Sequence, residues 1–234
     1  MVARVRTTGE VPAGMAFAPI HWNRAFASDA RVGGLTNPVV DPISGEPELK
    51  HTPVCVEPFV ADWHGVIFTR IAIPEPDTVW WTRVQGSQFS RYELVGRSHP
   101  DWTREARRML AVPEDAEIDW IEYSDPARRL YRGAWLRDEQ LQGCIHVDGR
   151  PSLPERGWLA SLFALRKIDG AARASMLAGR SLSGSDPGPL VCSCFGVGRK
   201  AIENCARQIG AGASGAEIGK RLKCGTNCGS CVPE

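Results

Sequence analysis

The sequence predicts an α+β protein built from several domains. Three observations support this class: short runs of β-branched and aromatic residues between turn residues, four segments typical of helices, and a separate cysteine-rich end. We expect one domain over residues 1–62, a second over 63–180 and a third over 187–234. The stretch 181–189 (SLSGSDPGP) is rich in Ser, Gly and Pro and indicates a boundary before the third domain.

The first domain is expected to combine strands with one long loop. The expected strands cover residues 2–6, 15–20 and 54–59. Residues 20–53 show no clear period and many turn residues, which is typical of a binding loop or of disorder. Trp22, Phe26 and Leu35 make disorder the less favoured interpretation.

The second domain is expected to be a small α+β unit. It holds seven of the eight tryptophans, which indicates a hydrophobic core. Strands are expected over 65–74, 78–84, 115–125 and 129–149, and helices over 99–113 and 154–165. His64, His99 and His146 stand alone and are interpreted as structural. No catalytic group of residues is evident in this stretch.

The third domain contains six of the eight cysteines, Cys55 and Cys144 being the others. Helices are expected over 198–210 and 214–222, and Ser214 with Glu217 matches a capping box. A hairpin of these helices brings Cys192 and Cys194 to face Cys228 and Cys231. Four thiolates in two close pairs suit either Zn or a 2Fe–2S cluster. Cys205 is expected to be a buried structural thiol. Cys224, four residues before a candidate ligand, has an alternative ligand or a resolving thiol as its less favoured roles.

Two features favour the cluster over Zn. Gly225, Gly229 and Ser230 allow backbone N–H groups to approach sulfur atoms closely. The module also carries a slight excess of basic side chains, which suits an anionic centre. Three of these, Lys220, Arg221 and Lys223, follow one another at a helix end, where positive charge also suits the helix C-terminus. They are candidates to receive an acidic electron donor.

The motif CSCFGVG…EIGKRLKCGTNCGSCVPE strengthens this interpretation. It resembles the 2Fe–2S domain first known from bacterioferritin-associated ferredoxin, over about 45 residues. The resemblance implies a helix-turn-helix-like module with Cys192, Cys194, Cys228 and Cys231 as the four ligands.

The motifs PIHW, GLTN, DP-x-S and EPELK, in this order, carry a second resemblance. They resemble the C-terminal domain of molybdopterin-dinucleotide oxidoreductases, and in particular the cytoplasmic assimilatory nitrate reductase catalytic subunit. The resemblance implies a partial β-barrel-type domain over 1–62 that contacts molybdopterin guanine dinucleotide. Its candidate contacts are His21, Trp22, Thr36, Asn37 and Lys50. Taken singly, Trp22 also suits a core position and Lys50 a solvated charge, and Gly33 departs from the family pattern.

Composition limits the possible partners. The 234 residues have a formal net charge of +1, which disfavours nucleic acid. No run approaches the ~20 apolar residues that a bilayer requires. Charges, Gly and Pro interrupt the first twenty residues, so we expect no signal peptide and a cytoplasmic protein. Reducing conditions then disfavour disulfides.

Together these patterns predict the electron-transfer part of a molybdenum nitrate reductase. The resemblance implies a ferredoxin, flavodoxin or NAD(P)H-linked flavoprotein as donor and an upstream catalytic portion as acceptor. No molybdenum ligand is evident, so the chain alone is expected not to reduce nitrate. It is expected to be a fragment, a separately encoded piece or a partial gene model. The alternatives are a Zn-stabilised docking module and a free-standing ferredoxin-like carrier.

Overall fold

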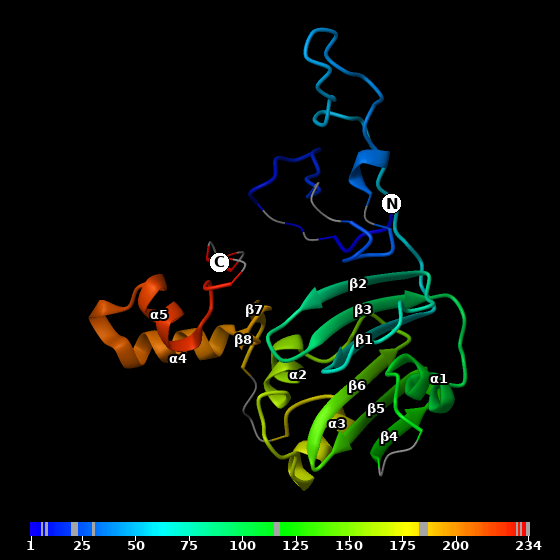
Figure 1. Cartoon of the computed structure of the whole chain (residues 1–234), viewed down its shortest axis with the longest axis vertical. Helices are drawn as coiled ribbons and strands as arrows, with labels where there is room; N and C mark the ends of the chain where they lie inside the picture. Colours follow the sequence, from blue (N-terminus) through cyan, green and yellow to red (C-terminus); the bar gives the residue numbers. More distant parts are fainter. Residues whose placement is uncertain are drawn as a thin grey trace.

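The chain folds around one six-stranded antiparallel sheet. A computed structural model describes residues 1–5, 7, 9–19, 23–29, 31–114, 118–182, 187–227, 229 and 231–232. The strands are β1 (Trp63–Thr69), β2 (Trp80–Gln85), β3 (Ser90–Gly96), β4 (Asp119–Asp125), β5 (Leu130–Arg137) and β6 (Gln140–Asp148). Their order is β2-β3-β1-β6-β5-β4, so β2 and β4 are edges and the sheet does not close into a barrel (Figure 1).

Both faces of the sheet are covered, which explains the apolar character of β1. Because successive side chains point to opposite faces, Phe68 faces one side and Ile67 the other. Phe68 packs with Trp158 and other side chains of α2 (Arg156–Leu162), and with Met176 of α3 (Gly170–Ala178). Ile67 belongs to the second buried cluster, which includes α1 (Trp102–Met109). The result is three layers, with the sheet between α1 and the α2–α3 pair.

Local signals set the helix ends. Asp101 precedes α1, and its carboxylate accepts a hydrogen bond from the backbone N–H of Thr103. Asp169 caps α3 in the same way through Ala172. Gly179 then ends α3 in the left-handed conformation, which costs little without a Cβ atom.

The cysteine-rich end forms a small unit beside α2. It contains the two-stranded pair β7 (Leu190–Cys192) and β8 (Val197–Gly198), followed by α4 (Arg199–Ile209) and α5 (Gly215–Leu222). The two expected helices are confirmed, and Ser214 accepts a hydrogen bond from the N–H of Glu217. Figure 1 shows β7 and β8 beside α2, and α4 and α5 extending away from the sheet.

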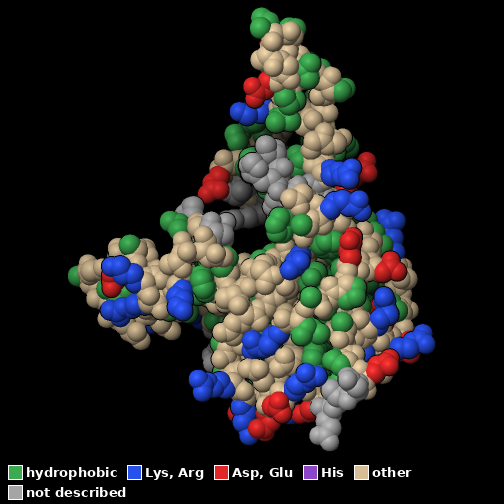
Figure 2. Space-filling view, viewed as in Figure 1, with side chains coloured by type: hydrophobic (Ala, Val, Ile, Leu, Met, Phe, Trp, Pro, Cys, Tyr) green, Lys and Arg blue, Asp and Glu red, His purple; other side chains and the backbone are tan. Residues whose placement is uncertain are grey.

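The N-terminal segment differs from its expected strands. Among the described residues of 1–62, only the short 3-10 helix η1 (Val32–Gly34) and two isolated bridges form. The strands expected at 2–6, 15–20 and 54–59 are wrong for the described residues, because alternation makes a strand only where a partner backbone is available. The described residues of 31–60, which we call the arm, project from the sheet instead, with apolar side chains on their surface (Figures 1 and 2).

The elements expected over residues 63–180 match the structure more closely. Strands β4, β5 and β6 and helices α1 and α2 fall within the predicted ranges, whereas β1 begins before its predicted range and β2 ends one residue after its own. Strand β3 and helix α3 were not predicted. None of the helices in the described parts of the chain is long and apolar enough to cross a bilayer.

Candidate metal centre and cofactor contacts

The cysteines of the β7–β8 pair lie in a small buried cluster. Cys192 ends β7, and Cys194 follows in the ligand loop, which we define as residues 192–197. Both cysteines are buried together with Val197. The side chains packed against them are Phe195, Ala201, Ile202, Leu222, Cys224 and Cys231. The helical hairpin therefore does return Cys231 to the first cysteine pair, while Cys228 lies outside the described residues.

The chemistry of these thiols fits a thiolate-bound centre. Burial and then a hydrogen bond with the Cys192 thiol raise the pKa of Cys231. The backbone N–H of Gly225 donates toward the Cys231 sulfur and acts in the opposite direction. Bound metal removes such protons outright, and N–H donors aimed at sulfur suit an iron–sulfur cluster. Gly225 has φ +79°, a conformation that favours glycine.

The described residues supply only part of a complete ligand set. Within them, no group of three or more His, Cys, Asp or Glu side chains is arranged to hold a metal ion. The fourth expected ligand, Cys228, falls outside them. The four-cysteine assignment therefore stays a prediction, supported by the proximity of Cys192 and Cys231.

The remaining cysteines differ in how deeply they are buried. Cys205 of α4 is buried, as expected for a structural thiol, and Cys144 is buried in the sheet. Burial raises the pKa of Cys144 to about 12, so this thiol is inert at neutral pH. Burial and then the neighbouring Cys192 raise the pKa of Cys224, which packs against the cysteine cluster. Cys55 is exposed in the N-terminal segment.

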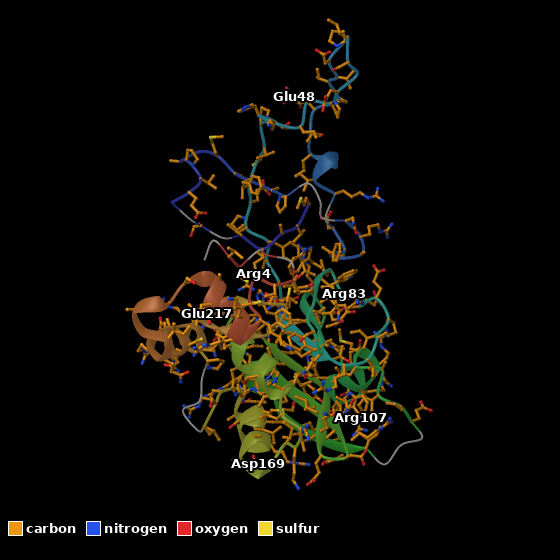
Figure 3. The ribbon with its side chains drawn as sticks, turned by 60° about the vertical axis from the view of Figure 1, so that its left-hand side comes forward. Arg4, Glu48, Arg83, Arg107, Asp169 and Glu217 are labelled. Atoms are coloured by element: carbon orange, nitrogen blue, oxygen red, sulfur yellow. The ribbon has the colours of Figure 1, made fainter. Side chains whose placement is uncertain are left out.

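Three of the candidate cofactor contacts, Thr36, Asn37 and Lys50, lie along the arm. His21 and Trp22 lie outside the described residues. Thr36 donates its hydroxyl hydrogen bond to the Gly33 carbonyl at 2.9 Å, and Asn37 and Lys50 are exposed. Among the described residues, no hydrogen bond or ion pair joins Thr36, Asn37 and Lys50. Figure 3 shows the neighbouring Glu48 on the arm and Arg4 where the N-terminal segment meets the sheet.

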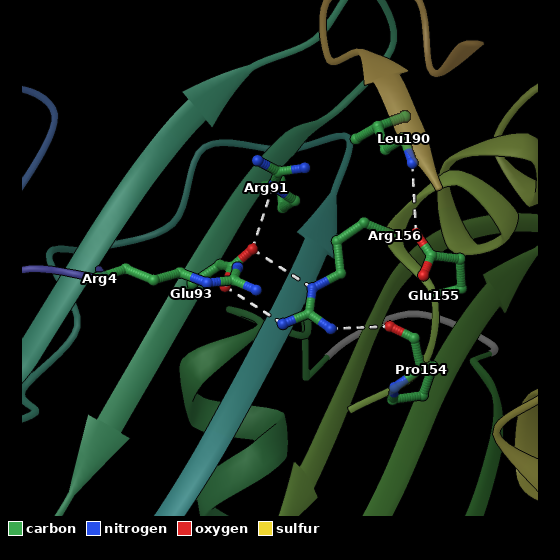
Figure 4. Close-up of polar contacts among 7 residues, drawn as sticks. All are labelled: Arg4, Arg91, Glu93, Pro154, Glu155, Arg156 and Leu190. Atoms are coloured by element: carbon green, nitrogen blue, oxygen red, sulfur yellow. Dashed lines mark hydrogen bonds and ion pairs between the residues drawn. The ribbon is translucent and has the colours of Figure 1, made fainter. Parts of the chain in front are cut away.

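A charge network centred on the largely buried Glu93 links the N-terminal segment, the sheet and α2. Glu93 of β3 pairs with Arg156 at 3.2 Å, with Arg4 at 2.7 Å and with Arg91 at 3.8 Å (Figure 4). Burial alone raises the pKa of Glu93, but the arginines, Arg156 foremost, hold it below its ordinary value. No partner for Glu93 was evident from sequence. The alternation of Tyr92 and Leu94 with Arg91 and Glu93 was the available signal for this strand.

Comparison with known proteins gives a matching domain family for each end of the chain. Residues 1–53 match the family model of the "Molydopterin dinucleotide binding domain". Residues 190–234 match that of the BFD-like 2Fe-2S binding domain. The chain thus carries both expected cofactor-binding domains. A nitrate reductase from Klebsiella oxytoca is 33% identical over 240 residues.

That alignment includes 100% of this chain but 26% of the relative's length. The chain thus spans about a quarter of the nitrate reductase that it resembles. No solved structure matches it. The two domain matches support both expected cofactors, a molybdopterin dinucleotide and a 2Fe–2S cluster.

Proposed function

We propose that this chain is the electron-transfer and cofactor-contacting portion of a molybdenum-dependent nitrate reductase of the assimilatory type. The observation that supports the proposal is the buried pair Cys192 and Cys194, with the partly buried Cys231 packed against it, within a BFD-like domain. The N-terminal match and the nitrate reductase relative supply the molybdenum context. When bound, the 2Fe–2S group is a one-electron carrier.

The residues of the chain hold and shield that group. Cys192, Cys194, Cys228 and Cys231 would ligate it. Phe195, Ile202 and Leu222 would exclude water on the side of the helical hairpin. The Gly225 N–H donates toward the Cys231 sulfur and would favour the reduced, more negative state.

The N-terminal segment is proposed to contact an upstream catalytic portion. Its apolar side chains are unusually exposed for a folded protein: Ile43 is 95% exposed and Phe17 is 79% exposed. Burial of this surface by the upstream portion would complete the molybdopterin guanine dinucleotide site. Thr36, Asn37 and Lys50, with His21 and Trp22, remain the proposed contacts.

Iron content and absorption of the purified chain test the cluster. A 2Fe–2S protein is brown, whereas a Zn module is colourless. We expect Cys192→Ser to lose most of the iron, because an alkoxide replaces a thiolate poorly. Cys55→Ser is the matched control and should keep full iron, because Cys55 is exposed in the N-terminal segment, far from the cluster cysteines in sequence. A colourless wild-type protein with stoichiometric zinc would overturn the proposal.

The donor is proposed to be an acidic protein that docks near α5, with a ferredoxin or flavodoxin favoured. Lys220, Arg221 and Lys223 are exposed there, although Lys220 also pairs with Glu217 at 3.4 Å. Changing all three to Glu should slow reduction by such a donor about tenfold at low salt. Reduction by dithionite, which needs no docking surface, should not change.

A matched charge reversal separates docking from net charge. Arg104, Arg107 and Arg108 are exposed on α1, and Figures 1 and 3 show α1 far from α5. Changing these three to Glu alters the net charge by the same amount. If both triple variants slow the protein donor equally, the donor does not dock at α5.

A further inference from the structure

The ligand loop is held on two sides by the main sheet domain. On one side, the backbone N–H of Ser87, in the β2–β3 turn, donates a 2.7 Å hydrogen bond to the carbonyl of Cys194. On the other side, α2 packs against β7 and β8. We infer that the β2–β3 turn and α2 form a fixed seat for the metal centre, with the Ser87 N–H as a positioning group. The inference rests on the proposed function, because it concerns the same cysteines.

The turn side of the seat is rigid. The N–H of Gly86 donates to the carbonyl of Phe89 at 2.8 Å and closes the turn. The Phe89 ring is buried against Phe68 and Phe163, at centroid distances of 5.0 and 5.5 Å. Arg70 also donates to the Gln88 carbonyl at 3.3 Å. A donor on so constrained a turn fixes the position of its acceptor.

The helix side of the seat depends on close backbone approach. A Cβ atom on Gly157 of α2 would lie 2.8 Å from the carbonyl oxygen of Gly188. A Cβ atom on Gly196 of the ligand loop would lie 2.9 Å from the Cβ of Ala160. Real Cβ atoms almost never approach so closely, so both glycines are needed for this contact. Glu155 adds a hydrogen bond, accepting from the N–H of Leu190 at 3.3 Å.

The first turn of α2 is in turn fixed to the sheet. Arg156 donates to both carboxylate oxygens of Glu93, at 3.2 and 3.3 Å. Their side chains are only 15% and 12% exposed, so water screens this pair little. Figure 4 shows the path from Glu93 through Arg156 to the adjacent Glu155 and Leu190. The strand β7 is therefore tied to β3 through α2.

Holding the Cys194 carbonyl fixes the backbone from which its thiol projects. The potential of an iron–sulfur cluster depends on hydrogen bonds around its sulfur atoms and on its exposure to water. The seat would therefore set both the location and the potential of the centre. It also opposes a swinging motion of residues 187–234 about the stretch 181–189.

A pair of substitutions at Ser87 tests the seat in the full, iron-loaded chain. Ser87→Pro removes the N–H donor, whereas Ser87→Ala keeps it and removes only the hydroxyl group. We expect Ser87→Pro to shift the reduction potential and the EPR line shape of the cluster. Amide exchange in β7 and β8 should become about fivefold faster, the usual effect of one lost hydrogen bond. Ser87→Ala should match the wild type in all three measurements.

A second pair keeps the test decisive if Ser87→Pro fails to fold. Gly157→Ala favours helix α2 locally but places a Cβ atom against Gly188. Gly170→Ala is the matched control, because a Cβ atom in the first turn of α3 meets nothing within 4 Å. Only Gly157→Ala should shift the potential and speed exchange in β7 and β8.

Equal potentials and equal exchange within each pair would overturn the seat. The proposed function fails differently, since a wild-type chain without a 2Fe–2S spectrum would refute it. In that case the exchange comparison still decides whether the seat exists.

Discussion

Phe68 and Phe17 are identical side chains in opposite surroundings. Phe68 lies in β1 and is 0% exposed, whereas Phe17 lies in the N-terminal segment and is 79% exposed. The same contrast separates Val66, which is buried, from Val5, which is exposed. Apolar residues are present in both regions, but only residues 63–182 supply partner strands and helices that cover them. A hydrophobic pattern therefore predicts burial only where the strands or helices that cover its side chains belong to the same chain.

The largest expected effect tests this contrast directly. Phe68→Ala should lower the free energy of unfolding by about 3–5 kcal/mol, because it opens a cavity beside Phe89 and Phe163. Phe17→Ala should change it by no more than about 0.5 kcal/mol, since it removes no buried contact. Denaturant unfolding followed by tryptophan fluorescence measures both. Comparable losses in the two variants would mean that the N-terminal segment is packed in solution.

The sheet was largely predictable because its signals are local. Buried runs such as that of β1, the tryptophans and the helix cap at Asp101 all lie within a few residues of the element they specify. Strand β3 was missed because Arg91 and Glu93 occupy half-buried positions, where Arg156 neutralises the carboxylate. Helix α3 was missed because its residues are small and its apolar face is weak.

The site was predictable only in part, for a similar reason. Cysteine spacing and the Ser214 cap are local, so the helical hairpin and the return of Cys231 toward Cys192 followed from sequence. The hydrogen bond from Ser87 to Cys194 could not be predicted from the sequence. Its donor is a backbone N–H, which nearly all residue types have. The close approach of Gly157 to Gly188 is equally hidden, since glycine has many uses.

A buried histidine gives the next expected effect. His146 of β6 is buried beside Arg132 and Arg156, and its Nδ1 has no hydrogen-bond partner within the described structure. Burial, and then these two arginines, lower its pKa to about 3. In the unfolded chain the pKa of this histidine is about 6.5. Below that pH the unfolded chain therefore binds a proton that the folded chain does not bind. Folding stability should therefore fall as the pH drops from about 6.5 toward 3.

The size of this loss follows from the same pKa difference. Between pH 7 and pH 5, His146 should account for roughly 2 kcal/mol of lost stability. His146→Gln removes the titrating group, so its stability should vary less with pH over this range. His51→Gln, in the exposed N-terminal segment, is the control and should keep the wild-type pH dependence. Denaturant unfolding at several pH values measures this, and an unchanged slope in His146→Gln would refute the assignment.

The smallest expected effects concern two carboxylates that accept backbone hydrogen bonds. Asp169 accepts from Ala172 at 2.8 Å and caps α3, so Asp169→Ala should cost about 1 kcal/mol of global stability. Asp41 accepts from Ile43 at 3.0 Å and from Ser44 at 2.7 Å in a turn of the arm. The hydrogen bond from the Ser44 N–H, and then that from the Ile43 N–H, lower the pKa of Asp41. Protonation should loosen the turn only as the pH falls through that lowered value.

Backbone hydrogen bonds also close the turn at Asp41. Removing the Asp41 carboxylate should therefore affect only the stability of this turn. The Asp41 N–H donates to the Glu46 carbonyl and the Glu48 N–H to the Val39 carbonyl, both at 2.9 Å, so local backbone hydrogen bonds order this turn. Asp41→Ala should speed amide exchange at Ile43 and Ser44 and leave the global unfolding midpoint unchanged. Asp169→Ala should lower that midpoint, because α3 is part of the packed layer on the sheet. If Asp41→Ala lowers the midpoint as well, the arm unfolds together with the sheet, and the two regions are one cooperative unit.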